Sequence, residues 1–338
     1  MNRQFPPEIV QLIVKASLDP YDLFTASTHG SPIHYDILGS YCLLNSTWYG
    51  ASQPELLRSV ELRTNESGEE FLEMAERRGG TVEGVRDLYV SANYDGDSST
   101  LPKLLKSTPH LLNLYCNDVA MELGDLAPLQ KLCRLQLVTV DVAGSHSSSR
   151  LCLPHLRRLA MIDLRLQEPA PHFLTPACLR RLRRLETDDF DFTDPLIPQL
   201  EIINPYSEAV DYPLLSHAKS LLLLPLSQYF DERLDMLFNL PSLPPFLHID
   251  YASVMDFDDV DYEVALALEE LLGAKKPGLR IILLNDHGIE DSVKSLIQRL
   301  QERGIRVQLV DKELDFDGAI EEMYRIRAEE KRASEAAL

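Results

Sequence analysis

The stretch LLNLYC, residues 111–116, is one copy of a pattern that recurs along much of this chain. Leucine occupies its first and fourth positions, and cysteine, a small apolar residue, occupies the sixth. Because successive side chains of a strand point to opposite faces, the fourth and sixth positions face the same way. The pattern therefore predicts a short strand with one buried face.

The same pattern, Leu-x-x-Leu-x-Leu with aliphatic substitutes, returns before and after this stretch. Its fourth-position residues are Val60, Leu88, Leu114, Leu135, Leu159 and Leu185. They lie 28, 26, 21, 24 and 26 residues apart, within or near the leucine-rich-repeat period of about 20–29 residues. Residues 67–78 and 99–110 lie between copies and read as helical or turn segments. Since one unit alone would leave a face uncovered, we expect the units to stack into a β/α solenoid.

Beyond residue 190 the pattern becomes irregular, with expected strands at 200–203, 218–224 and 246–251. Strand–helix–strand alternation returns at 279–310, which predicts parallel pairing. Such alternation suits the end of a solenoid or the start of a doubly wound domain, and continuity with the repeats favours the solenoid. A Glu/Arg/Ala-rich helix is expected over 313–338, partly frayed at its end.

Composition limits the possible partners. The 338 residues are 45% apolar and 25% charged, with a net charge of −20, which argues against nucleic acid or an anionic membrane as the main partner. Five cysteines without a CxxC pair indicate neither a disulfide framework nor a zinc site, and favour the cytoplasm or nucleus. The longest aliphatic run, LLLL at 221–224, is too short to span a bilayer, so we expect a soluble intracellular protein.

A search for enzyme motifs finds little. The chain has no GxSxG, HExxH, Walker loop or GxGxxG sequence. Asp286 and His287, in NDHG after an expected strand, suit either an acid–base pair or a polar turn, and the turn is favoured. The acidic run at 256–263 lacks the glycine of a calcium loop. We therefore expect no catalytic residue, no metal and no cofactor.

The N-terminal segment FPPEIVQLIV, residues 5–14, predicts a short amphipathic helix. Pro7 suits the first helical position, and Glu8 suits the positive end of the helix dipole. Ile9, Leu12 and Ile13 follow at helical spacing and form one apolar stripe. A second, longer helix is expected over 35–52. Residues 1–56 are thus expected to form a small helical domain.

These two segments resemble the F-box family. FPPEIVQLIV is similar to the opening Leu-Pro-x-Glu-Ile/Leu of the box, with Phe5 in place of leucine, and residues 35–57 resemble its second half, with Trp48 at the tryptophan position. The nearest likeness is to fungal F-box proteins with irregular leucine-rich repeats. The resemblance implies docking onto the Skp-type adaptor of a cullin–RING ubiquitin ligase, and a structural role for Trp48. With the apolar stripe, the expected adaptor-binding residues are Pro6, Pro7, Ile9, Leu12, Ile13, Leu43 and Leu44.

The third and fifth positions of each repeat point away from the buried face, so they are expected to line a concave substrate surface. The expected substrate-binding residues there are Tyr89, Tyr115, Arg134, Arg158 and Arg184. One interpretation is a basic stripe that holds an acidic or phosphorylated peptide by forked guanidinium bonds. The other is that Asp163, Glu186 and Asp188 pair with these arginines and leave no net field.

Together these patterns predict an α/β protein in three parts: an F-box-like helical domain at 1–56, an irregular leucine-rich-repeat solenoid at 57–312, and a C-terminal helix at 313–338. The resemblance implies a substrate-recognition subunit of a Skp–cullin–F-box ubiquitin ligase, with no enzymatic activity of its own. The alternative is a leucine-rich-repeat interaction scaffold not coupled to ubiquitination. An autonomous α/β enzyme is the third reading.

Overall fold

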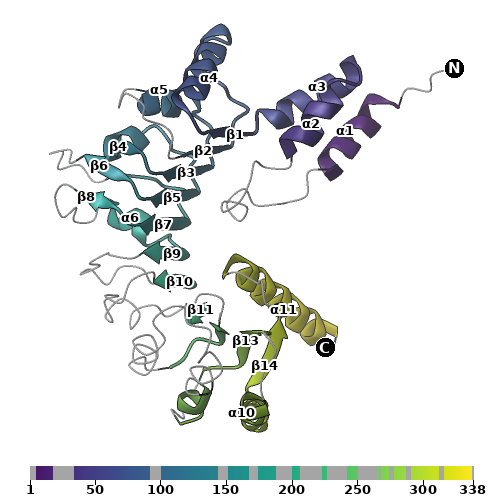
Figure 1. Cartoon of the computed structure of the whole chain (residues 1–338), viewed down its shortest axis with the longest axis vertical. Coiled ribbons are helices and arrows are strands. Elements are labelled where there is room, and N and C mark those ends of the chain that lie inside the picture. Colours follow the sequence, from purple (N-terminus) through teal and green to yellow (C-terminus); the bar gives the residue numbers. More distant parts are fainter. Residues whose placement is uncertain are drawn as a thin grey trace. The chain divides into compact units, whose positions relative to one another are not determined.

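The computed structural model divides the chain into two compact units, Met1–Arg181 (unit 1) and Leu182–Leu338 (unit 2). Figure 1 shows the chain and its elements. The residues that the structure describes are 5–17, 34–91, 100–143, 151–166, 174–187, 200–205, 223–226, 242–249, 265, 268–273, 278–286, 291–311 and 316–336. The domain limits expected after residues 56 and 312 stay predictions.

Unit 1 opens with three helices, α1 (Pro7–Ser17), α2 (His34–Cys42) and α3 (Ser46–Leu56). The single helix expected over 35–52 is wrong, because Asn45 divides it. Its backbone is extended, and its side-chain oxygen accepts hydrogen bonds from the N–H groups of Thr47 and Trp48 at 2.9 and 3.2 Å. Such a cap satisfies donors that have no partner within the helix, so a new helix begins at Ser46.

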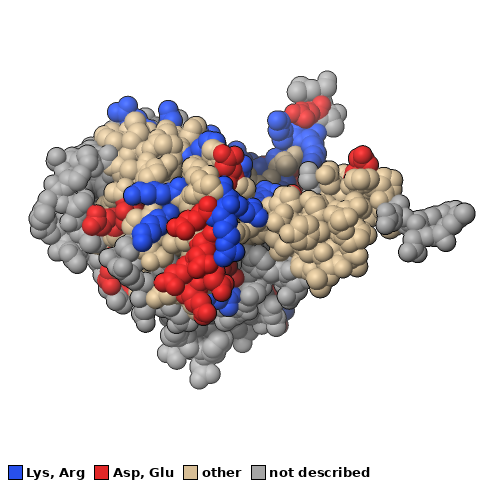
Figure 2. Space-filling view, turned by 90° about the horizontal axis from the view of Figure 1, so that it is seen from above, with Lys and Arg blue, Asp and Glu red and all other residues tan. Residues whose placement is uncertain are grey.

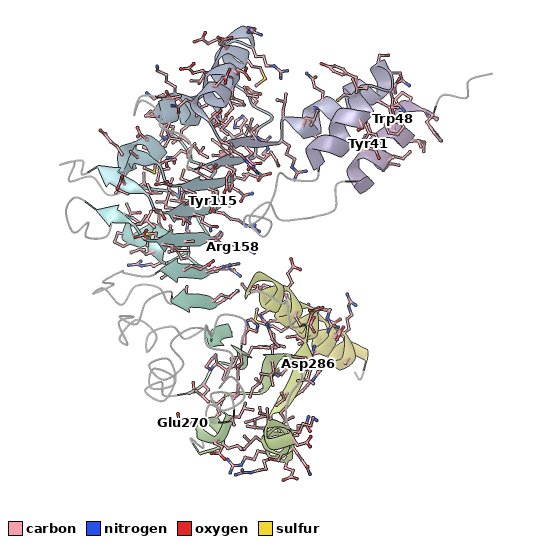
Figure 3. All side chains as sticks on the ribbon, viewed as in Figure 1. Tyr41, Trp48, Tyr115, Arg158, Glu270 and Asp286 are labelled. Carbon is pink, nitrogen blue, oxygen red and sulfur yellow. The ribbon has the colours of Figure 1, made fainter. Side chains whose placement is uncertain are left out.

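The three helices share a small core. Val10, Val14 and Leu38 are buried at its centre, and Trp48 packs against them from the side. The ring centroids of Trp48 and Tyr41 are 4.9 Å apart with the planes tilted by 47°. Trp48 is half-buried, so it contributes to this core from its edge, as Figure 3 shows.

The main sheet of unit 1 holds β1 (Ser59–Leu62), β2 (Asp87–Val90), β3 (Asn113–Asn117), β5 (Arg134–Val138) and β7 (Arg158–Ile162). The strands are parallel and lie in chain order. The fourth-position residues of the repeat, from Val60 through Leu114 to Leu159, lie directly opposite one another. The pattern in the sequence thus sets the register of the sheet.

Helices lie between successive strands. They are α4 (Asn65–Arg77), α5 (Thr100–Ser107), the 3-10 helix η1 (Leu123–Leu126) and α6 (Pro176–Leu179). Thr64 caps α4, since its hydroxyl accepts a hydrogen bond from the N–H of Ser67 at 3.2 Å. In β3 the fourth and sixth positions, Leu114 and Cys116, are fully buried, as are Leu104 and Leu105 of α5.

A second, three-stranded sheet follows the main strands of unit 1. It comprises β4 (Ala120–Glu122), β6 (Asp141–Ala143) and β8 (Arg165–Leu166). The residue directly after β3, β5 and β7 has a positive φ in each case: 53° at Asp118, 51° at Thr139 and 50° at Asp163. All three turns are left-handed, so the chain enters the second sheet at the same position of each of these three repeats. The sequence pattern did not reveal this bend.

Unit 2 continues with parallel strands. They are β9 (Arg184–Thr187), β10 (Ile202–Pro205), β11 (Leu223–Leu226), β12 (Phe246–Ile249), β13 (Ile281–Asn285) and β14 (Arg306–Val310), again in chain order. Gly278 precedes β13 with φ of 115°, and a Cβ there would lie 2.1 Å from the carbonyl oxygen of Leu243. Glycine is therefore required at this turn.

Unit 2 also contains the helices α10 (Asp291–Glu302) and α11 (Phe316–Ala336), and its residues 268–273 are helical. The first half of α11 contributes Ala319, Ile320, Met323 and Ile326 to a core that includes Phe246. The expected mixed α/β class is confirmed, and its described strands form parallel sheets that do not close into a barrel.

Thr139 generates a prediction about stability. A β-branched residue is strained at φ of 51°, whereas asparagine tolerates this conformation. We expect Thr139→Asn to raise the free energy of unfolding by about 0.5–1 kcal/mol. Urea unfolding followed by circular dichroism measures it. Thr139→Val keeps the branched shape and is the matched control, so an equal gain in both variants would contradict the explanation.

Candidate functional site

The predicted adaptor residues belong to the three-helix unit, and most of them are exposed. Pro6 and Pro7 are exposed, and Ile13 is half-buried. Relative exposure is 58% for Phe5, 41% for Ile9, 62% for Leu12, 87% for Leu43, 59% for Leu44 and 49% for Tyr49. We call these six side chains the apolar patch. Figure 2 shows a broad area over the N-terminal helices without Lys, Arg, Asp or Glu side chains.

The unit 1 sheet carries polar side chains on the face opposite its buried leucines. The third positions form the row Ser59, Asp87, Asn113, Arg134 and Arg158, and the fifth positions form the row Glu61, Tyr89, Tyr115, Gln136 and Ala160. Members of a row lie directly opposite one another on neighbouring strands, which are about 4.8 Å apart. We call these two rows the polar face.

Two tyrosines stack at the centre of the polar face. The ring centroids of Tyr89 and Tyr115 are 4.3 Å apart, and their planes differ by only 7°. Tyr115 is buried, whereas Tyr89 is half-buried. Burial raises the pKa of both phenols, most strongly that of Tyr115. The stacked pair therefore exposes part of the flat ring of Tyr89 to solvent, while the ring of Tyr115 is buried.

A hydrogen-bonded network fixes the β1 end of the polar face. The carboxylate of Asp87 accepts from the Ser59 hydroxyl at 2.9 Å and from the amide of Asn113. Beside it, Arg63 donates to Glu61 at 2.6 Å, and this bond raises the pKa of Arg63. These polar groups bond to one another, and with two carboxylates and one guanidinium the β1 end of the face carries a net negative charge.

The other end of the polar face carries two arginines. Arg134 and Arg158 are half-buried and lie directly opposite one another on β5 and β7. Figure 3 shows Arg158 and Tyr115 on the same sheet. Unit 1 thus brings together four of the five predicted substrate residues.

Arg184 belongs to unit 2 and is 8% exposed. Its Nε donates to Glu186, also 8% exposed, at 2.5 Å. The neighbouring Arg183 donates to Glu201 at 3.1 Å. The acidic pairing weighed in the sequence analysis is therefore seen at Arg184, while Asp188 lies outside the described residues. Burial and this ion pair occupy the guanidinium of Arg184, and its role in substrate binding stays a prediction.

Unit 2 contains a polar pair that sequence reasoning missed. His248 of β12 and Asn285 of β13 are fully buried, and His248 Nε2 lies 3.0 Å from Asn285 Oδ1. A histidine and an asparagine inside apolar strands were the only signals. Asp286 follows at the exposed end of β13, and its N–H donates to the Val310 carbonyl at 3.0 Å. His287 and the acidic run at 256–263 lie outside the described residues.

Neither the described side chains nor the comparisons identify a known site. Among the described residues, no three His, Cys, Asp or Glu side chains are grouped as a metal site. The same part of the chain contains no helix with the length and apolarity needed to cross a membrane. No protein-family model matches this chain, and no curated protein matches it.

The tyrosine pair generates a pH prediction. Because the pKa of Tyr115 in the fold is above its ordinary value of about 10, its contribution to stability is fully present below about pH 10. It is lost at higher pH, where the phenol ionises in the unfolded chain first. We therefore expect the free energy of unfolding of the native chain to fall relative to Tyr115→Phe between about pH 9 and 11.

Urea unfolding at several pH values measures this difference. Tyr89→Phe is the graded comparison, because the pKa of Tyr89 is raised less and the ring is more exposed. We expect the same sign and a smaller effect. A pH-independent difference for Tyr115→Phe would show that this phenol is hydrated in the fold.

Proposed function

We propose that this chain is a substrate-recognition subunit of a Skp–cullin–F-box type ubiquitin ligase. In this proposal α1, α2 and α3 form an F-box-like domain that binds a Skp-type adaptor. The parallel strands form an irregular leucine-rich-repeat solenoid whose polar face binds a protein substrate. The protein would act in the cytoplasm or nucleus and carry no catalytic residue of its own.

The apolar patch is the observation that carries the adaptor half of the proposal. Leu43 and Leu12 are exposed by 87% and 62% in a three-helix unit whose own core is small. Several large apolar side chains exposed on one small group of helices are typical of a protein-binding site. The F-box resemblance assigns adaptor contacts to Pro6, Pro7, Ile9, Leu43 and Leu44 on the same unit, so two independent lines favour one partner.

The polar face supports the substrate half. Arg134 and Arg158 lie directly opposite one another on neighbouring strands, so an anion bound to both would reduce the repulsion between them. Guanidinium groups bind carboxylates and phosphates through paired hydrogen bonds. The ring of Tyr89 would add flat apolar contact. An acidic or phosphorylated segment fits this combination best.

Adaptor binding tests the proposal. We expect the double variant Ile9→Asp with Leu43→Asp to lose binding to a purified Skp-type adaptor, because each new carboxylate would be buried without a partner, at a cost of several kcal/mol. Isothermal titration calorimetry with the full chain measures it. Ile9→Leu with Leu43→Met keeps the surface apolar and is the control. Circular dichroism must show that both variants are folded.

Two outcomes would count against the ligase assignment. The first is that the folded Asp variant binds the adaptor as tightly as the native chain. The second is that the native chain fails to bind at all, which would favour an interaction scaffold not coupled to ubiquitination, with the helices as a structural cap of the repeats.

Substrate binding is tested with a peptide rich in aspartate and phosphoserine. We expect Arg134→Glu with Arg158→Glu to weaken binding by at least about tenfold and to remove most of its salt dependence. Adaptor binding should be unchanged. Arg77→Glu with Arg78→Glu at the end of α4 is the control, since this pair makes the same charge change outside the polar face. Equal weakening by the control would assign the effect to net charge alone.

A further inference from the structure

Among the described strands of unit 2, the last one, β14, has a neighbour on one side only. β14 pairs with β13 over its whole length, from Arg306 opposite Ile281 to Val310 opposite Asn285. No described strand pairs with its other edge, and β14 ends the strand order. Figure 1 shows β14 at the edge of its sheet, with α11 beside it. An edge strand of this kind is a template for another extended segment.

The backbone hydrogen bonds show which groups face outward. The N–H of Arg306 donates to the Arg280 carbonyl at 2.8 Å, and the Val310 carbonyl accepts from the N–H of Asp286 at 3.0 Å. Both bonds point toward β13. Because direction alternates along a strand, Val307 and Leu309 point their N–H and C=O groups to the free edge. Two donors and two acceptors are therefore available for an added strand.

A groove runs along this edge. It is open, measures about 520 Å³ and is lined on one side by Gln308, Leu309, Val310 and Asp311 of the β14 segment. The other side is one face of α11, formed at helical spacing by Gly318, Glu321, Glu322 and Arg325. The amide of Gln308 donates to Glu322, which fixes the helix beside the strand.

The groove is acidic. Its lining contains three carboxylates and one guanidinium, and this guanidinium is already engaged. Arg325 donates to both Glu322 and Glu329, and the first of these bonds lowers the pKa of Glu322. Glu321 is exposed and forms no ion pair with any described residue. A cationic side chain of a ligand could therefore form an ion pair with Glu321.

At this edge the two faces of the sheet differ in the side chains that they expose. Gln308 points toward α11, so Leu309 points to the opposite face of the sheet by strand alternation, where it is 48% exposed. A strand added to this edge would place alternate side chains beside Glu321 and beside Leu309. Charge complementarity selects basic residues for the first set, and burial of Leu309 selects apolar residues for the second.

We propose that the free edge of β14 binds an extended peptide segment of a partner protein in which basic and apolar residues alternate. The segment adds a strand to the unit 2 sheet through the outward groups of Val307 and Leu309. Its basic side chains enter the groove beside α11, and its apolar side chains cover Leu309. This surface is separate from the apolar patch and the polar face, so it does not depend on the proposed ligase function.

A second copy of this chain fits the edge less well. Pairing two β14 strands would bring two acidic grooves together, and like charges facing each other oppose such pairing. A basic partner gains from the same charges. The partner segment is therefore a different chain, and self-association is an outcome that the experiment distinguishes.

The experiment uses the full chain and a ten-residue fluorescent peptide of alternating lysine and valine, with binding followed by anisotropy. We expect saturable binding that weakens as salt is raised. An alternating glutamate–valine peptide should not bind. Two lysine–valine peptides N-methylated on opposite sets of residues should differ, since only one set of N–H groups faces β14.

Amino-acid substitutions test whether the peptide binds at the free edge of β14. Glu321→Lys should weaken binding by about tenfold or more, whereas Glu302→Lys on α10 makes the same charge change outside the groove and should leave affinity unchanged. Leu309→Pro removes an outward N–H without touching the β13 pairing, and should weaken binding more than Leu309→Ala does. Circular dichroism must show that each variant remains folded.

Four results would overturn the proposal. One is equal loss in Glu321→Lys and Glu302→Lys, which means non-specific charge attraction. Another is equal affinity of both N-methylated peptides, which excludes strand addition. The third is a dimer of the native chain in light scattering that Leu309→Pro dissociates, which assigns the edge to a second copy. Absence of any lysine–valine peptide binding also rejects it.

Discussion

The in-register stacking of parallel strands is the constraint on which the structure of each unit depends. A strand of four or five residues satisfies its backbone groups only through its neighbours, and in unit 1 each strand aligns its fourth-position residue with the next, as Leu114 does with Leu135. A slip of one residue would turn every buried leucine outward. The register of the strands therefore decides which residues form the core, and it also decides which side chains lie on each face of the sheet.

Because the strands are aligned, a repeat along the sequence becomes a row of side chains across the face of the sheet. Because every second residue is committed to the core, the residues between them form rows across neighbouring strands, and one row can change character along its length. In unit 1 the third-position row passes from the Ser59–Asp87–Asn113 network to two adjacent arginines. A ligand that spans several strands would therefore meet a gradient of charge, with the stacked tyrosines beside it.

The three N-terminal helices differ from the sheet in how they distribute apolar side chains between core and surface. Their buried core is a handful of side chains, while Leu12, Leu43 and Leu44 remain largely exposed. An isolated domain gains nothing from such exposure, because apolar surface left in water forgoes stabilisation of about 25 cal/mol per Å². The same apolar residues become favourable once a partner covers them, which is the basis of the proposal that these helices bind another protein.

The sequence by itself indicated the main-sheet strands of unit 1, their register and their buried face, because the leucine pattern has the period of two that a strand imposes. It also identified the apolar stripe of α1 and the neighbouring arginines 134 and 158. It did not indicate the second sheet of β4, β6 and β8. It did not determine the division of the second helix, which rests on the local cap at Asn45, or the left-handed bends at Asp118, Thr139 and Asp163. Only the tertiary structure decided that Arg184 is buried with Glu186, that His248 lies against Asn285, and that an acidic groove lines the free edge of β14. These features join residues through side-chain packing and through contacts between distant elements, and no spacing along the chain encodes such contacts.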